Sequence, residues 1–148
     1  MLEEVEIAFI SENDLDEVYQ IEIECFGEDA YPRWVFRYLL ENSNSIFLKA
    51  STNNLIVGFI VGICSRRRCH LYTIDVRKAY RRRNIGSMLL EAFEREAIKR
   101  NVELVILQVE VNNLPALNLY LKRGYKIVKR IKNYYGLGRD AYEACKNL

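Results

Sequence analysis

The chain has 148 residues, half of them hydrophobic and 28% charged, with a formal net charge of +2. This composition is typical of a globular protein. The length suits a single domain, 1–148, whose hydrophobic core does not need disulfides or metal ions to be stable. The small net charge does not indicate nucleic acid as the main partner. No apolar run approaches the roughly 18 residues that a membrane-spanning helix needs. The acidic start, Met1–Glu4, lacks a secretion-signal pattern and indicates the cytoplasm.

The first half of the chain predicts two helices and four strands. Apolar positions at helical spacing predict a helix over Asp14–Glu24, with Asn13 or Asp14 as its N-cap. Pro32 suits the first turn of a second helix, Pro32–Glu41. The predicted strands are Val5–Ile10, Ile46–Ala50, Leu55–Cys64 and His70–Val76, and the turn cluster Thr52–Asn54 suggests a hairpin between the second and third.

The second half predicts alternating helices and strands. Ile85, Leu89, Phe93 and Ala97 form an apolar stripe, so Ser87–Arg100 is the clearest helix. The other predicted elements are the strand Glu103–Val109, the helix Leu114–Lys122 ended by Gly124, and the strands Tyr125–Lys132 and Ala141–Lys146. This order of elements predicts one α/β domain.

Four cysteines are spread along the chain with no C-x-x-C spacing and no histidine at metal-ligand intervals. Such cysteines usually behave as small buried apolar residues. We therefore expect free buried thiols and no metal site. The four are Cys25, Cys64, Cys69 and Cys145.

A basic segment, Val76–Gly86, lies between a predicted strand and the clearest predicted helix. Backbone N–H groups at a helix N-terminus can hold a phosphate, and Arg81–Arg83 supply positive charge. Asn84 tolerates a positive φ, and Gly86 allows close backbone approach. The alternative is a solvated basic loop, because neither common glycine-rich nucleotide motif occurs. The first interpretation suggests a cofactor that carries a pyrophosphate.

Three segments together carry a family resemblance. Arg81-x-x-Asn84-x-Gly86 resembles the acyl-CoA-binding motif of the GNAT superfamily of N-acetyltransferases, although Asn84 stands where that family usually has Gly. The segments Val109–Asn113, Ala116–Tyr120 and Gly124–Tyr125 resemble the family's next strand, helix and turn. Lys132–Tyr135 with Asp140–Ala141 is similar to the N-Y-Y…D-A signature of protein N-terminal acetyltransferases of the ribosomal-protein-alanine and archaeal branch.

The resemblance implies an α/β (α+β) GNAT fold, with a mixed, mostly antiparallel sheet of about seven strands flanked by about four helices. It implies acetyl-CoA as cosubstrate and direct attack by the α-amine of a protein N-terminus in a ternary complex. By resemblance, the pantetheine arm pairs with the backbone of Ile74, Asp75 and Val76 as an added strand. The remaining cofactor contacts that it implies are Arg81, Arg82, Arg83, Asn84, Ile85, Gly86, Ser87 and Asn113; Asn113 also suits a helix N-cap.

Tyr120 stands where the family has the tyrosine that hydrogen-bonds or protonates the cofactor sulfur. The alternative is a core aromatic that shares a helix face with Leu117 and Leu121. The family's position for the base does not hold a carboxylate here. The ribosomal-protein-alanine branch has Glu twelve residues before this tyrosine, but here that position is Gln108, which cannot accept a proton.

Two other places offer a base. His70 lies four residues before Ile74, where related enzymes use a Tyr or His, and an imidazole changes charge near neutral pH. A lone histidine on a strand is equally consistent with a structural role. Asp29 and its neighbour Glu28 lie in a loop that resembles the archaeal substrate loop, and the alternative for them is a solvated turn. Glu110 is a weaker option.

The acceptor side follows from the same resemblance. Tyr31 on one side and Tyr134 and Tyr135 on the other would flank the first residues of a peptide, with Gln108 nearby, although these aromatics also suit a core or rim. An α-amine with a pKa near 8 is roughly a tenth neutral at pH 7, so a weak base favours N-termini over lysine. Two alternatives stay open: acetylation of small amines or lysine, and a non-catalytic acyl-CoA-binding module. We expect a monomer, with a dimer as the alternative.

Overall fold

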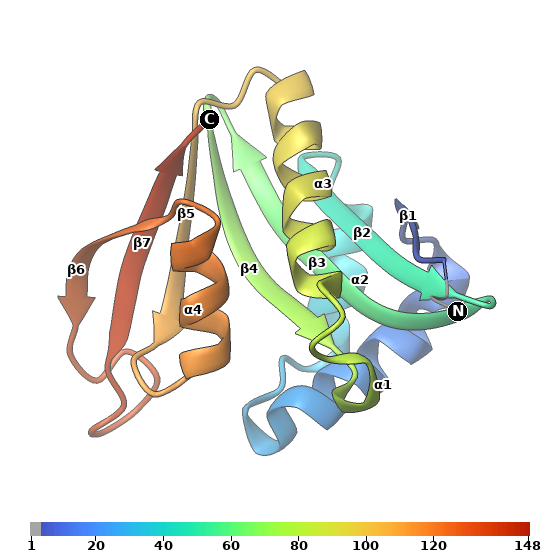
Figure 1. The fold of residues 1–148 in the computed structure, drawn as a ribbon, viewed down its shortest axis with the longest axis horizontal. Helices are drawn as coiled ribbons and strands as arrows, with labels where there is room; N and C mark the ends of the chain where they lie inside the picture. The colour runs from blue at the N-terminus through green and yellow to red at the C-terminus, as the bar shows by residue number, and fades with distance from the viewer. Residues whose placement is uncertain (1–3) are drawn as a thin grey trace.

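The computed structural model describes residues 4–148 and contains a seven-stranded sheet in the order β1-β2-β3-β4-β5-β7-β6 (Figure 1). All neighbouring strands are antiparallel except β4 and β5, which are parallel. The strands are β1 (Glu6–Phe9), β2 (Ser45–Thr52), β3 (Leu55–Ser65), β4 (Arg68–Val76), β5 (Leu104–Glu110), β6 (Lys126–Ile131) and β7 (Ala141–Asn147). The predicted mixed, mostly antiparallel sheet is confirmed.

Four helices flank the sheet, as predicted: α1 (Leu15–Phe26), α2 (Arg33–Glu41), α3 (Ile85–Lys99) and α4 (Leu114–Lys122). Figure 1 shows α3 and α4 in front of the sheet and α1 and α2 behind it. Among residues 4–148, no helix is long and apolar enough to cross a membrane. Of the N-terminal segment used to judge a secretion signal, Met1–Glu3 lies outside the described residues.

The predicted helix caps are partly confirmed. Gly124 follows α4 with φ 95°, the left-handed conformation expected just past a helix end. Asp14 directly precedes α1 but does not cap it with its side chain. Its carboxylate instead accepts hydrogen bonds from the Ser11 backbone N–H at 2.8 Å and from Lys49 at 2.7 Å. This ion pair ties the start of α1 to β2.

Each face of the sheet has its own hydrophobic core. On the α3 face, Leu89 and Phe93 are fully buried against the strands. Two glycines of β3 permit this close packing, because a Cβ on Gly62 would lie 2.8 Å from the Phe93 ring and one on Gly58 would lie 3.3 Å from Leu89. Burial of each large apolar side chain contributes about 1.5–3 kcal/mol. The packing therefore fixes the direction of α3 and the position of its N-terminus.

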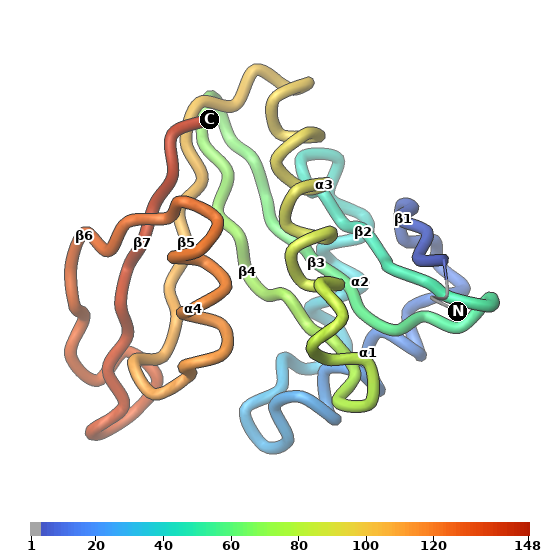
Figure 2. The backbone as a smooth tube through the Cα atoms, in the orientation of Figure 1, coloured from blue at the N-terminus to red at the C-terminus, as the bar shows by residue number. Residues whose placement is uncertain are grey.

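The strands β4 and β5 separate after their first residues. Only Arg68–Leu71 of β4 pairs with Leu104–Leu107 of β5, although both strands continue beyond that point. Figure 2 shows the two backbones diverging toward the end of β4. A register shift opposite Val61 and Gly62 adds Tyr72 to β4 as a bulge, which increases the local bend. The second half of β4 therefore has no strand partner on its β5 side among the described residues.

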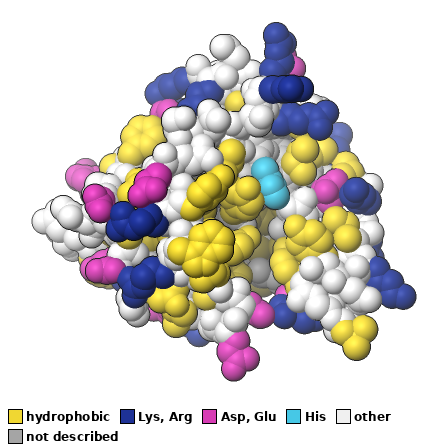
Figure 3. All heavy atoms as spheres, turned by 180° about the vertical axis from the view of Figure 1, so that it is seen from behind, with side chains coloured by type: hydrophobic (Ala, Val, Ile, Leu, Met, Phe, Trp, Pro, Cys, Tyr) yellow, Lys and Arg dark blue, Asp and Glu magenta, His cyan; other side chains and the backbone are white. Residues whose placement is uncertain are grey.

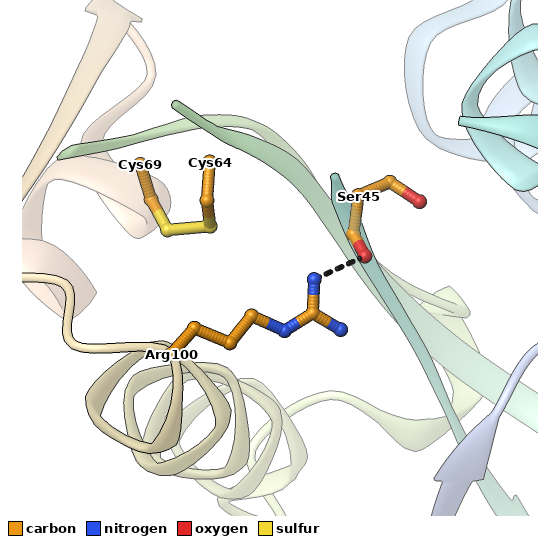
Figure 4. The surroundings of a disulfide bond; sticks show 4 residues. All are labelled: Ser45, Cys64, Cys69 and Arg100. Carbon is orange, nitrogen blue, oxygen red and sulfur yellow. Dashed lines mark hydrogen bonds between the residues drawn. A yellow bond between two sulfur atoms is a disulfide. The ribbon is translucent and has the colours of Figure 1, made fainter. Parts of the chain in front are cut away.

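The structure corrects the expectation of four free thiols, because Cys64 and Cys69 form a disulfide (Figure 4). The two residues are directly opposite each other in the β3–β4 hairpin. Their spacing of five gave no motif to recognise; pairing depends on the tight turn at Arg66, whose φ is 59°. Cys25 and Cys145 are free, but both are only half-buried. Beside the disulfide, Arg100 donates a hydrogen bond to the Ser45 carbonyl at 2.9 Å (Figure 4).

Removal of this disulfide is expected to lower stability without changing the fold. The loop that it closes is short, with a sequence separation of five, so the loss in the free energy of unfolding should be about 2 kcal/mol. Urea unfolding of the double variant Cys64→Ser, Cys69→Ser against the oxidised parent measures this. Cys145→Ser, which changes a free thiol, is the control. Equal midpoints for the oxidised parent and the double variant would contradict the expectation.

Candidate functional site

The N-terminus of α3 has several free backbone donors. The first helical hydrogen bond runs from Met88 N–H to the Asn84 carbonyl at 3.0 Å. Among the described residues, the N–H groups of Ile85, Gly86 and Ser87 have no such partner, no side chain caps α3, and its first turn carries no acidic residue. Free N–H groups and the positive end of the helix dipole together favour an anion.

The loop before α3 has the backbone that the sequence predicted. Asn84 has φ 63°, so the asparagine does adopt the left-handed conformation that a glycine would adopt easily. The three arginines differ in placement. Arg81 turns back, and its guanidinium donates to the Val76 carbonyl at 3.1 Å at the end of β4. Arg82 and Arg83 are exposed, with Arg83 over the ring of Tyr80.

Tyr120 lies on α4, next to the region where β4 and β5 separate. Asn113 caps α4 by accepting a hydrogen bond from the Ala116 N–H at 3.4 Å, as expected. Tyr120 is buried in the core and packs edge-on against Tyr125. Burial raises the pKa of Tyr120 above its ordinary value, with Asp75 adding a smaller effect, so the phenol keeps its proton at neutral pH. Among the described residues its hydroxyl has no hydrogen-bond partner, so it is available as a donor.

His70 and Gln108 are in direct contact. His70 Nε2 lies 2.6 Å from Gln108 Oε1, and the Gln108 amide donates to Glu143 at 3.0 Å. An amide oxygen can only accept, so this contact places the histidine proton on Nε2 and the lone pair on Nδ1. Gln108 thus fixes the orientation of the imidazole and links it to a carboxylate, although it cannot itself take a proton.

Two loops face each other on the α1–α2 side of the sheet. Arg139, in the β6–β7 loop, donates two hydrogen bonds of 3.0 Å to Asp29 in the α1–α2 loop. It also contacts Glu110 at the end of β5 at 2.6 Å. Asp29 is therefore engaged in a bidentate ion pair that joins the loops. Glu28 is exposed and has no ion pair within residues 4–148.

The β6–β7 loop is built by the residues of the N-Y-Y…D-A pattern. Asp140 accepts the Asn133 backbone N–H at 3.0 Å, and Asn133 in turn accepts the Gly138 N–H at 2.7 Å. These bonds hold a tight turn that presents Tyr134 and Tyr135, both exposed, with their rings edge to face. The pattern thus has a local structural reason as well as a predicted functional one.

An apolar pocket of about 320 Å³ lies beside these loops. Figure 3 shows hydrophobic side chains gathered near the centre of this face, next to the single histidine. The Tyr72 ring is 4.7 Å from His70 and also lines the pocket. The lining residues are Tyr31, Trp34, Val35, Tyr38, Leu39 and Tyr72. The structure therefore brings Tyr31 and His70 to the same region.

Two buried carboxyl groups lie behind the loop that carries Tyr31. The backbone of Asp75 was predicted to pair with the cofactor, and its side chain is fully buried. Glu22 on α1 is 1% exposed. Sequence reasoning missed Glu22, although a glutamate four residues after Val18 on an apolar helix face is a signal that could have found it. It also missed Arg139, whose partner Asp29 is 110 residues away and leaves no local pattern.

The comparisons with known proteins identify the family. Residues 15–125 match the model of the acetyltransferase (GNAT) family. The chain belongs to this family. It is 35% identical over 143 residues to an N-alpha-acetyltransferase of Sulfurisphaera tokodaii, covering 87% of this chain and 84% of that protein. GNAT enzymes use acyl-CoA, so a CoA thioester is the expected acyl donor.

Solved structures agree with the fold. The Ard1 protein from Thermoplasma volcanium superposes with a TM-score of 0.88 at 26% identity, and 97% of each chain is covered. The ribosomal-protein-S18-alanine N-acetyltransferase from Escherichia coli superposes with a TM-score of 0.89 at 23% identity, covering 97% of this chain and 94% of that one. The second likeness shows the shared fold alone. Together these matches confirm the GNAT fold that the sequence implied.

Proposed function

We propose that residues 1–148 form one catalytic domain that transfers the acetyl group of acetyl-CoA to the α-amine of a protein N-terminus, in the cytoplasm. One arrangement carries the proposal: free N–H donors lie at the start of α3 on one face of the sheet, and the apolar pocket lies on the face covered by α1 and α2. A cofactor and an acceptor that entered from opposite faces would meet where β4 and β5 separate. The N-alpha-acetyltransferase relatives support the choice of an α-amine.

The residues present fit acetyl-CoA. The N–H groups of Ile85, Gly86 and Ser87 suit a pyrophosphate, with Arg82 and Arg83 as exposed countercharges. The backbone of Ile74–Val76 lacks a strand partner toward β5, so it can pair with an extended amide-bearing arm. When bound, acetyl-CoA supplies the thioester carbonyl that the amine attacks. Asn84 is proposed to set the conformation of the loop before α3. Asn113 is proposed mainly to cap α4 and also to contact the cofactor.

We assign the acid role to Tyr120. Its burial keeps the phenol protonated, so its hydroxyl can donate a hydrogen bond to a sulfur atom that gains negative charge. Tyr120 is at once a core aromatic and the proposed donor, since its ring packs in the core while its hydroxyl is free.

We assign proton acceptance to His70 through Nδ1. The demand on a base is small, because roughly a tenth of an α-amine with a pKa near 8 is neutral at pH 7. Asp29 is less suited, since Arg139 engages both of its oxygens, and it serves here to join the two loops. Glu28, which is exposed in the α1–α2 loop, is proposed to attract the substrate amine. Gln108 orients the imidazole and would lie beside the acceptor.

The acceptor groove is proposed to run between the two loops. Tyr31 would flank one side of an extended peptide, and Tyr134 and Tyr135 the other. All of these residues belong to one chain, so a monomer supplies a complete site. The partner is a peptide N-terminus, with no nucleic acid and no membrane.

A panel of acceptors tests this function. Purified protein with labelled acetyl-CoA should label peptides that differ only in their first two residues, and it should leave spermidine and aminoglycosides unlabelled. Labelling of the small amines alone would replace the proposal with a small-molecule acetyltransferase. Binding of acetyl-CoA without turnover on any amine would indicate a binding module.

The pH dependence tests His70. His70→Ala is expected to flatten the acid limb of the pH profile of kcat/KM, because the group that accepts the proton is lost. Initial rates between pH 5.5 and 9 measure it, in steps of about half a unit. Glu143→Gln is the matched control: it keeps an acceptor for the Gln108 amide and leaves His70 in place. An acid limb in His70→Ala identical to the parent's would exclude the imidazole as base.

A further inference from the structure

Glu22 and Asp75 lie inside the molecule with one oxygen each accounted for. Thr73 donates its hydroxyl proton to Asp75 Oδ1 at 2.6 Å, and the Tyr31 backbone N–H donates to Glu22 Oε2 at 2.9 Å. The other two oxygens, Glu22 Oε1 and Asp75 Oδ2, are buried and have no partner among the described residues. Both carboxyl groups are almost completely excluded from solvent.

Two unpaired carboxylates at this depth would be very costly, because burial penalises each charge and the charges repel. Burial first, and then the neighbouring Glu22 carboxyl, raise the pKa of Asp75 well above its ordinary value. The two carboxyls can bond to each other only if one carries a proton, since ionised carboxylates are acceptors alone. A single proton between Glu22 Oε1 and Asp75 Oδ2 would satisfy both orphan atoms.

The groups around the pair do not remove the need for this proton. Arg81 lowers the pKa of Asp75, but less than burial and Glu22 raise it, and its guanidinium donates to the Val76 carbonyl and to Cys25 Sγ at 3.6 Å. Burial and Asp75 raise the pKa of the Cys25 thiol to about 11, so it stays neutral. Tyr31 and Tyr120 also face the pair, and both keep their protons at neutral pH because burial raises their pKa values.

We propose that Glu22 and Asp75 share one proton and, through the bond from Glu22 Oε2 to the Tyr31 N–H, position the acceptor loop. Both are positioning residues. This rests on the proposed function, because the loop matters only if it binds an acceptor. Loss of the shared proton would leave two repelling charges behind the loop, so acceptor binding weakens as the pH rises through that loss.

The proton itself can be seen without any activity. The infrared spectrum of the parent protein at pH 7 should contain the carbonyl band of a protonated carboxylic acid. Asp75→Asn should lose this band, since Glu22 would then accept N–H bonds from Tyr31 and from the new amide. Glu94→Gln is the control, because Glu94 is buried but already paired with Lys146 and Tyr125. No band in the parent, or a band that survives in Asp75→Asn, would overturn the proposal.

The positioning role needs a second readout. Glu22→Ala should speed hydrogen exchange of the Tyr31 amide and raise the acceptor KM about tenfold, with kcat changed less than twofold. Glu22→Gln keeps an oxygen for the Tyr31 N–H and should behave like the parent at pH 7. Equal effects of Glu22→Ala and Glu22→Gln would contradict the positioning role of Glu22. If no peptide is acetylated, the proposed function fails, yet the infrared and exchange results still decide the shared proton and the loop contact.

Discussion

Gly86→Val is expected to weaken acetyl-CoA binding about a hundredfold or more. A Cβ at this position would lie 3.1 Å from the Leu119 side chain, so a branched residue must displace either that side chain or the start of α3. The same change covers free N–H groups at the N-terminus of α3. Isothermal titration with acetyl-CoA measures the loss, and circular dichroism checks that the fold is kept.

Met88→Val provides the matched control for this change. Met88 lies in the same turn of α3 and is half-buried, but its N–H already bonds to the Asn84 carbonyl and is not one of the free donors. Valine there tests the cost of a β-branched residue at the start of the helix. Acetyl-CoA binding by Gly86→Val with parental affinity would show that the start of α3 does not hold the cofactor.

Tyr120→Phe is expected to lower kcat about a hundredfold, with little change in the affinity for acetyl-CoA. The ring that packs in the core is kept, and only the hydroxyl that donates to the leaving sulfur is lost. Steady-state kinetics at saturating cosubstrate measure kcat, and fluorescence titration measures affinity.

Tyr125→Phe separates this effect from a general loss of packing. Tyr125 is also buried and contacts the Tyr120 ring, but its hydroxyl donates to Glu94 at 2.9 Å, away from the proposed chemistry. Its removal should reduce stability and leave kcat near the parent value. An unchanged kcat in Tyr120→Phe would remove this tyrosine from the acid role.

Much of the fold could be predicted because its signals are local. The helix predicted over Leu114–Lys122 has those bounds in the structure, and the stripe of α3 was visible in its apolar spacing. The β3–β4 turn contains no Gly, Pro or Asn that would mark it in the sequence. The residue with the positive φ there is Arg66. The exact opposition of Cys64 and Cys69 was therefore not predictable, and the disulfide was missed.

The candidate site divides along the same line. The loop before α3 and the capping by Asn113 were visible as short motifs, and the structure has both. The contacts that join distant segments were not visible. Arg139 meets Asp29 across 110 residues, and Glu22 and Asp75 come from α1 and β4. No sequence spacing encodes which loops face each other; that depends on packing on both faces of the sheet.

The central claim is that the acetyl group goes to an α-amine. The most direct measurement uses one peptide with a free N-terminus and one internal lysine, incubated with the protein and acetyl-CoA. Fragmentation by mass spectrometry then locates the added acetyl group. Acetylation at the N-terminal residue, and none on a copy whose α-amine is blocked, is the predicted result. Acetylation of the lysine in both peptides would contradict the account.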